Sequence, residues 1–275
     1  MSRTSPSADA AELLGFAHSL ADAAAVETLA YFKCGAAVID KGEPGAFDPV
    51  TAADRNAERV MREMIAARYP DHGIHGEEFG HLGSNSALGW VLDPIDGTRA
   101  YIMGWPLWGT LIAASRDGRP AIGLMDQPYT GERFWGDGHS AFWRQKDRAA
   151  TPLRTRICSD LGQALLATTD PRLFAPGHEL AAFARLEAQV RMSRYGGDCY
   201  AYVMLAAGLT DLVVEAGLKP HDIAALIPII EGAGGVITTW DGGPASDGGR
   251  IIAAGDARLH AAASAVLNAP STPAR

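Results

Sequence analysis

Cysteine is scarce in this sequence: its 275 residues include only Cys34, Cys158 and Cys199. An odd number of widely spaced cysteines, without a Cys-x-x-Cys pair, argues against both a disulfide framework and a cysteine-based zinc site. We therefore expect three free thiols that serve mostly as small core residues.

Positive charge and long apolar runs are also missing. Lys and Arg total 24 against 32 Asp and Glu, a net charge of -8, whereas broad nucleic-acid binding needs a basic surface. No stretch approaches the roughly 20 apolar residues that span a bilayer, and Glu12, His18 and Asp22 interrupt the apolar residues that a secretory signal would require. We expect a cytoplasmic enzyme that binds neither nucleic acid nor membranes.

The first half of the chain has the pattern of two helices followed by a sheet. Apolar residues recur at helical spacing over residues 8–33 and again around Val60, Met61, Met64 and Ile65. A loop rich in Gly, Pro and Lys is expected at residues 35–49, and the segment 69–73 should end the second helix. Short apolar or alternating runs separated by Gly, Pro and Asp predict strands at residues 89–92, 110–114, 121–125 and 133–135.

The second half alternates strands with helices. The pattern predicts strands at residues 164–168, 211–215 and 250–254 and helices at residues 179–186, 200–207, 222–231 and 257–267. A basic stretch at residues 144–156 precedes this half. We therefore predict two lobes, residues 1–150 and 151–275, that join near residues 145–160.

The most informative segment is residues 90–99, in which an apolar strand ends at two aspartates on either side of a proline. Pro94 fixes its own backbone angle and lacks a donor, so a sharp turn could aim Asp93 and Asp96 at one point, with the Ile95 carbonyl between them. Three hard oxygen donors suit Mg2+ better than zinc or copper. A polar turn capped by aspartates would have the same sequence.

Three further features each allow a structural or a functional interpretation when taken alone. Gly97 and Thr98 are expected to open a helix whose amides could bind phosphate. The adjacent acids Glu77 and Glu78 would repel each other without a cation, but they could also form a solvated acidic turn. Asp222 follows a strand at the start of a helix, where it could be an N-cap or a metal ligand.

Four motifs in order resemble the inositol monophosphatase family: Asp48-Pro-Val-Thr-x-Ala-Asp54, Gly76-Glu-Glu, Asp93-Pro-Ile-Asp-Gly-Thr98, and Asp222-x-Ala-Ala followed by Glu231-Gly-Ala-Gly-Gly235. The resemblance covers residues 10–265 and implies a layered αβαβα sandwich, possessed also by fructose-1,6-bisphosphatase. It implies Mg2+ bound by Glu77, Asp93, the Ile95 carbonyl, Asp96 and Asp222. The first lobe would then carry most metal ligands, and the second lobe would carry Asp222 and the specificity residues.

The resemblance also implies a reaction in which metal ions activate the attacking water, with help from Thr98, Asp54 and Glu77. An isolated threonine is a poor base, so Thr98 would need a carboxylate such as Asp54 or Glu77 behind it. Helix capping is the alternative role for Thr98. The resemblance further suggests a homodimer.

Several motifs are most similar to the histidinol-phosphatase branch of the family, among them Gly76-Glu-Glu-Phe-Gly80 and Gly196-Gly-Asp-Cys-Tyr-Ala-Tyr202. This favours L-histidinol phosphate, whose ammonium and imidazole could pair with Asp198 and Glu215. A helix cap for Asp198 and a surface charge for Glu215 are the alternatives. Gly97, Thr98 and Arg99 are further candidates for substrate binding, although Arg99 could instead anchor a loop.

His221 departs from the family, which usually has Trp or Tyr before the metal-binding aspartate. It could be a partner of a metal ligand, a substrate contact or a smaller aromatic that fills the same space. His75 is expected to be a packed strand residue, and Trp90, Trp105 and Trp108 are expected to pack in the core or in loops.

Other activities remain possible at this point. The same chemistry could act on inositol monophosphate, a sugar phosphate or a 3'-phosphonucleotide without any change of metal ligand. A catalytically silent binding or regulatory protein could retain the same fold. A structural metal-binding protein is a third alternative, although open aspartates beside a helix N-terminus suit reversible Mg2+ binding better.

Overall fold

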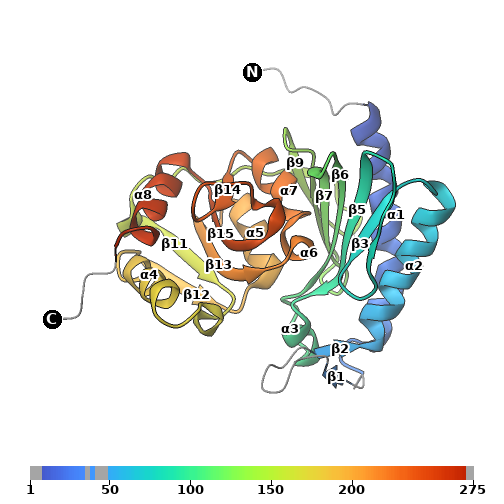
Figure 1. Cartoon of the computed structure of the whole chain (residues 1–275), viewed down its shortest axis with the longest axis horizontal. Helices are drawn as coiled ribbons and strands as arrows, with labels where there is room; N and C mark the ends of the chain where they lie inside the picture. Colours follow the sequence, from blue (N-terminus) through green and yellow to red (C-terminus); the bar gives the residue numbers. More distant parts are fainter. Residues whose placement is uncertain (1–7, 35–37, 41–48, 271–275) are drawn as a thin grey trace.

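The structure is a computed structural model that describes residues 8–34, 38–40 and 49–270. Helices and sheets alternate in five layers, and Figure 1 shows them from α1 and α2 on the right to α4 and α8 on the left. The predicted αβαβα sandwich is therefore confirmed.

Two long helices form the first layer. Helix α1 (Ala8–Tyr31) and helix α2 (Ala52–Arg68) pack together and cover one face of the larger sheet. Between them, β1 (Val38–Asp40) pairs antiparallel with β2 (Pro49–Thr51), so the prediction of an uninterrupted loop over residues 35–49 is wrong. Backbone pairing between two short segments leaves little trace in the apolar pattern, which explains the error. Asp48 lies outside the described residues.

The larger sheet has eight strands in the order β10-β9-β8-β7-β6-β5-β3-β4. It is antiparallel except for the parallel pair β3 and β5. The strands are β3 (Gly73–Gly76), β4 (Gly80–Leu82), β5 (Leu88–Asp96), β6 (Gly109–Arg116), β7 (Arg119–Gln127), β8 (Glu132–Gly136), β9 (Ala141–Gln145) and β10 (Thr151–Pro152). The four predicted strands are confirmed as parts of β5 to β8. The stretch expected to be merely basic contributes β9 and β10.

The smaller sheet has five strands in the order β12-β11-β13-β15-β14. Its strands are β11 (Leu165–Thr168), β12 (Met192–Tyr195), β13 (Leu212–Leu218), β14 (Val236–Thr239) and β15 (Gly249–Ala254). The helices of the chain's second half are α4 (His178–Glu187), α5 (Asp198–Ala206), α6 (Pro220–Ile223), α7 (Leu226–Gly232) and α8 (Ala257–Leu267). Short 3-10 turns lie at Leu161–Gln163, Pro171–Leu173 and Ala245–Asp247.

The predicted single helix over residues 222–231 is wrong, because the structure divides it into α6 and α7. Pro228 is the third residue of α7. A proline ring collides with the carbonyl four residues earlier in a continuous helix, so α6 has to end before α7 begins.

Three large apolar clusters hold the layers together. One lies between α1, α2 and the larger sheet, a second lies between the two sheets around α5, α6 and α7, and a third packs α4 and α8 on the smaller sheet. Burying a leucine or isoleucine contributes roughly 1.5–3 kcal/mol, so clusters of this size stabilise the central layer from both sides. Trp90 and Trp108 are buried as predicted, but Trp105 is half-exposed.

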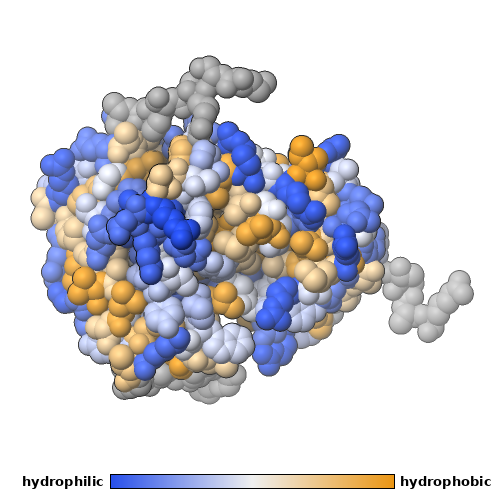
Figure 2. Space-filling model, turned by 180° about the vertical axis from the view of Figure 1, so that it is seen from behind, coloured by the Kyte–Doolittle hydropathy of each residue, from blue (hydrophilic) through white to orange (hydrophobic). Residues whose placement is uncertain are grey.

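All three cysteines are free thiols as predicted, with Cys158 and Cys199 buried and Cys34 exposed. Among residues 8–34, 38–40 and 49–270, no helix combines the length and apolar character needed to cross a membrane. On the face opposite to that of Figure 1, hydrophobic residues gather near the middle between hydrophilic ones (Figure 2).

Candidate metal and phosphate site

Strand β5 directs Asp93 toward the middle layer. Side chains alternate along a strand, and Trp90 and Leu92 pack in the cluster beneath α1 and α2. Asp93 therefore faces α6, which packs against β5. The strand ends at the two aspartates as predicted: β5 runs to Asp96, although its pairing with β6 shifts after Asp93 and resumes at Asp96. Such an irregularity redirects side chains without ending the sheet, so both aspartates still reach the same site.

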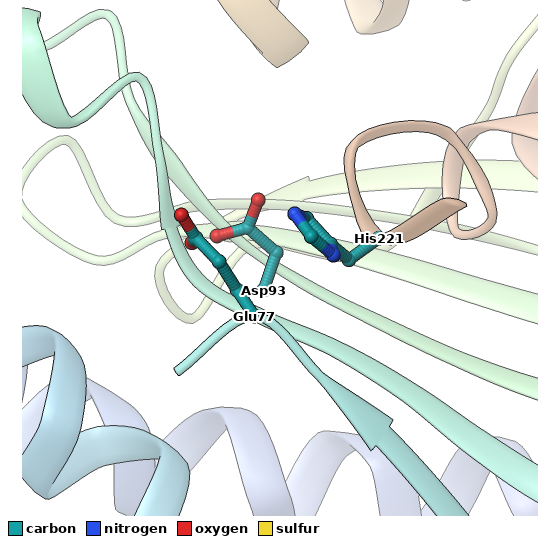
Figure 3. Close-up of side chains that lie close together, drawn as sticks. All are labelled: Glu77, Asp93 and His221. Carbon is teal, nitrogen blue, oxygen red and sulfur yellow. The ribbon is translucent and has the colours of Figure 1, made fainter. Parts of the chain in front are cut away.

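Three aspartates meet at this point. Carboxylate oxygens of Asp93, Asp96 and Asp222 all lie within 4.8 Å of one another, and a second group joins Asp93 to Glu77 and His221. Figure 3 shows Glu77, Asp93 and His221 converging from separate segments of the chain. Hard oxygen donors in this arrangement fit a divalent cation such as Mg2+.

The electrostatics of the aspartates favour a bound cation. Burial is the largest cause that raises the pKa of Asp93 well above its usual range, and the negative charges of Glu77, Asp96 and Asp222 add to it. Burial also raises the pKa of Asp96, followed by repulsion from Asp198 and Asp222. Several acids that repel one another are stabilised by a positive ion between them.

Glu77 is positioned by a carboxylate that sequence reasoning missed. The backbone N–H of Glu77 donates to the Leu92 carbonyl at 3.2 Å. The buried Glu58 side chain accepts from the N–H groups of Glu78 at 2.7 Å and Phe79 at 3.2 Å, and it pairs with Arg62. An acid on the buried face of α2 was the available signal, because a buried carboxylate needs specific partners.

Gly76 leaves room for this support. A Cβ atom at Gly76 would lie 2.0 Å from Glu58 Oε1. Any larger residue would therefore displace the Glu58 carboxylate that holds the turn after β3.

Asp222 is the third residue of α6, not its N-cap, which is Lys219. Its Oδ2 atom accepts from the Lys219 N–H at 2.6 Å, while Oδ1 lies 3.5 Å from His221 Nε2. Asp222 thus has a helix-capping role and also belongs to the aspartate group. The two roles that the sequence left as alternatives are compatible in one side chain.

Gly97 and Thr98 open α3 (Thr98–Ile102), as predicted. Gly97 has φ +86°, and a Cβ there would lie 2.8 Å from the Leu107 carbonyl oxygen, so glycine is needed at this crossing. The Thr98 hydroxyl donates to the Ile95 carbonyl oxygen at 3.0 Å. This bond fixes the orientation of the peptide whose carbonyl was predicted to bind metal.

A cavity of about 280 Å³ lies over these groups. Its lining includes almost every predicted site residue: Glu77, Asp93, Ile95, Asp96, Gly97, Thr98, Arg99, Asp198 and Asp222. Thr169 and Leu173 also line it, and sequence reasoning singled out neither of them. The volume suits a phosphate with a small organic group.

Asp54 is not among the residues that line this cavity. Its carboxylate is buried and accepts from the Thr51 N–H at 2.8 Å and the Thr51 hydroxyl at 2.6 Å. Burial raises its pKa to about 6, against those two hydrogen bonds. Its predicted part in catalysis therefore stays a prediction.

Asp198 and Glu215 lie beside the aspartate group. They line a smaller adjoining cavity of about 90 Å³ together with Asp96, Tyr202 and Asp222. Glu215 is 4% exposed, which excludes its interpretation as a surface charge. Asp198 is the first residue of α5 and Gly197 is the N-cap, so the cap interpretation of Asp198 is also wrong.

These two acids have unusual environments. Asp198 has φ +44°, a left-handed conformation that few residues other than glycine adopt. Burial raises the pKa of Asp198 to about 6 and that of Glu215 to about 7, and Arg99 partly offsets the effect at Asp198. The Thr169 N–H and hydroxyl both donate to Glu215. A positively charged substrate group would relieve the remaining repulsion.

The sequence model of the inositol monophosphatase family matches residues 9–270, and the chain therefore belongs to this family of metal-dependent phosphatases. Like its relatives, it is a phosphoric monoester hydrolase. The predicted family resemblance and enzyme class are confirmed.

The relatives carry different names. The chain is 42% identical over 255 residues to the chloroplastic bifunctional phosphatase IMPL2 of Arabidopsis thaliana, covering 88% of this chain and 71% of that protein. It is 36% identical over 252 residues to a histidinol-phosphatase of Streptomyces coelicolor, covering 90% and 93% respectively. A solved inositol monophosphatase from Zymomonas mobilis has a TM-score of 0.84 and 40% identity, covering 96% of this chain and 100% of its own. These names leave the substrate open.

Proposed function

We propose that this protein is a Mg2+-dependent phosphatase that hydrolyses L-histidinol phosphate to L-histidinol and phosphate, a step of histidine biosynthesis. The observation that carries the proposal is the position of Asp198 and Glu215 next to the aspartate group. Histidinol phosphate has an ammonium and an imidazole in addition to its phosphate. Charge-assisted bonds from the ammonium to these acids would distinguish it from an uncharged ester.

In this proposal Glu77, Asp93, the Ile95 carbonyl, Asp96 and Asp222 hold Mg2+. The bound ions would neutralise phosphate oxygens and activate the attacking water. Cys199 helps to orient Asp96, because its N–H donates to Asp96 Oδ2 at 2.6 Å.

Gly97, Thr98 and Arg99 bind the phosphate in this proposal. The Gly97 and Thr98 amides lie at the start of α3, where N–H groups suit an anion. Thr98 and Glu77 line the same cavity, and in this proposal they help to take up the proton of the attacking water. Asp54 would act indirectly, through Thr51 and the start of α2.

Inositol 1-phosphate is the second candidate substrate. Tyr202 lines the smaller cavity, and its buried hydroxyl has no hydrogen-bond partner within the described part of the chain. A substrate hydroxyl could satisfy it, and carboxylates also accept bonds from hydroxyls. The 40% identity to the Zymomonas mobilis inositol monophosphatase supports this alternative.

Phosphate release with Mg2+ from histidinol phosphate, inositol 1-phosphate, fructose 1,6-bisphosphate and 3'-phosphoadenosine 5'-phosphate tests the proposal. We expect a clear preference for histidinol phosphate that disappears in Asp93→Asn. Preference for another ester would refute the substrate but leave the metal chemistry in place. Absence of Mg2+-dependent release from all four would refute both.

A matched substrate isolates the contribution of the ammonium group. The analogue 3-(imidazol-4-yl)propyl phosphate differs from histidinol phosphate only in lacking the amine. A hydrogen bond to a charged group is worth about 1.5–3 kcal/mol, so kcat/KM should fall by about 10- to 100-fold for the analogue. In Asp198→Asn combined with Glu215→Gln the two substrates should become nearly equivalent. An unchanged ratio in this double variant would exclude these acids as the ammonium site.

We also propose a homodimer in the cytoplasm. Two apolar hollows of about 380 and 560 Å³ share Tyr200, Met204 and Leu209, and the Leu209 side chain is 64% exposed. Exposed apolar surfaces of this kind favour association. Sedimentation velocity of wild type and of Leu209→Glu tests the dimer. A monomeric wild type would refute the proposal. A wild-type dimer that dissociates in Leu209→Glu would support this surface as the interface.

A further inference from the structure

The His221 side chain lies next to two carboxylates of the metal site, a position that packing alone does not explain. One of its ring nitrogens lies within 4.8 Å of carboxylate oxygens of both Glu77 and Asp93, which are themselves within that distance of each other. Figure 3 shows the imidazole beside Asp93, with a ring nitrogen directed toward the carboxylate. The residue is only 7% exposed, so its ring faces the acidic site and not bulk water.

The orientation of this imidazole is constrained on two sides. Its ring stacks with that of His75, with centroids 6.0 Å apart and planes 25° from parallel. Its Nε2 atom lies 3.5 Å from Asp222 Oδ1. Side chains held by packing and by neighbouring polar groups make effective metal ligands, because little further ordering is required.

We propose that His221 supplies a nitrogen ligand to a cation shared with Glu77 and Asp93, which gives this site a higher affinity for borderline metals such as Zn2+. The inference rests on the proposed metal site. Ligands of one zinc ion lie about 2.0–2.2 Å from it and hence at most about 4.4 Å apart. The three donor atoms are already close to that separation.

The chemical identity of the donor atom decides which metal ions bind more tightly. Imidazole nitrogen is a good ligand for zinc and other transition metals, whereas Mg2+ prefers oxygen and retains water. Replacing His221 should therefore weaken Zn2+ binding much more than Mg2+ binding. A purely acidic site would not discriminate in this way.

Pulsed electron paramagnetic resonance of bound Mn2+ tests the ligand directly. We expect nitrogen coupling to Mn2+ in the wild-type protein, with the isotope change expected when all histidines carry 15N. His221→Phe should abolish the coupling. His75→Phe is the matched control and should retain it, because the His75 ring stacks on His221 and does not belong to the ligand group.

Calorimetric titration with Zn2+ and with Mg2+ gives a second readout that does not depend on activity. We expect His221→Phe to lose at least about 10-fold in Zn2+ affinity, because loss of a residue that only supports a metal ligand already costs about 10- to 100-fold. The change in Mg2+ affinity should be much smaller. Wild-type protein that binds Mn2+ without histidine coupling would overturn the proposal, even if the variants fail to fold. Coupling that survives His221→Phe would overturn it as well. The variant Asp93→Asn tests the metal site separately from the histidine ligand. Loss of Mn2+ binding in this variant would support the metal site, and Mn2+ binding that persists in it would refute the metal site.

Discussion

Glu215 allows the energetic cost of burying an acid in this site to be measured. Burial raises the pKa of this carboxyl from 4.5 to about 7, even though Thr169 donates two hydrogen bonds to it. Ionisation is therefore harder in the folded protein than in the unfolded chain. Glutamine keeps the shape and an acceptor oxygen but has no charge, so Glu215→Gln should remove the penalty.

The sign and size of the effect follow from the two pKa values. Below pH 4.5 the carboxyl is protonated in both states, and the penalty is absent. As the pH rises from 4.5 to about 7, only the unfolded chain ionises, and the wild type loses about 1.4 kcal/mol of stability per pH unit. Above the folded pKa the penalty stays constant at roughly 3 kcal/mol.

Urea unfolding in EDTA, at pH 5 and pH 8, checks this calculation. Glu215→Gln should exceed wild type in free energy of unfolding by about 1 kcal/mol at pH 5 and about 3 kcal/mol at pH 8. The control Glu63→Gln alters an exposed acid of α2 that pairs with Arg59, and an offset that grows with pH only in Glu215→Gln would identify the buried carboxyl as its source. A Glu215→Gln variant with the same offset at both pH values, or with lower stability than wild type at pH 8, would refute the reasoning.

Three other substitutions should distinguish residues that hold the site in place from residues that take part in the reaction or bind the substrate. Gly76→Ala should displace the Glu58 carboxylate, since its Cβ would lie 2.0 Å from Oε1; we expect a loss of about 1–3 kcal/mol in urea unfolding and weaker Mg2+ activation of phosphate release. Thr98→Val removes the hydroxyl that orients a ligand carbonyl, and kcat should fall by about 10-fold or more while circular dichroism is unchanged. Arg99→Ala removes a positive charge that lowers the pKa of Asp198, so the acidic limb of the pH profile of kcat/KM for histidinol phosphate should move to higher pH; an unmoved limb would separate Asp198 from substrate binding.

The elements that sequence reasoning predicted are those with a strong local pattern. Helices α1 and α8 were found because their apolar residues recur at helical spacing, and strand β6 was found because residues 110–114 form a short apolar run. The break between α6 and α7 could also have been predicted, because Pro228 excludes a continuous helix. By contrast, β1 has three residues and β10 has two, so they are too short to show a period of their own, and both are defined by backbone pairing with a neighbouring segment of the chain.

The same distinction applies to the site. Asp93 and Asp96 could be proposed from one peptide, since a proline between two acids after an apolar strand is a strong local signal. For Glu58 the sequence shows only an acid on the buried face of α2, and its partner, the Glu78 N–H in the turn after β3, becomes known only from the structure. The position of His221 beside Glu77 likewise depends on bringing the two halves of the chain together.

The site and the stability of the fold are coupled through these acids. Burial and mutual repulsion raise the pKa values of Asp93, Asp96 and Glu215, and groups of this kind destabilise a folded protein near neutral pH. If stability alone mattered, neutral residues at these three positions would serve the fold better. The Glu215→Gln variant tests this for one of them. Their arrangement is explained if a cation and a positively charged substrate offset the repulsion, because ligands that bind only the folded state add their binding free energy to its stability. Mg2+ should therefore stabilise wild type more than Asp93→Asn, and a melting temperature that Mg2+ raises equally in both would contradict this coupling.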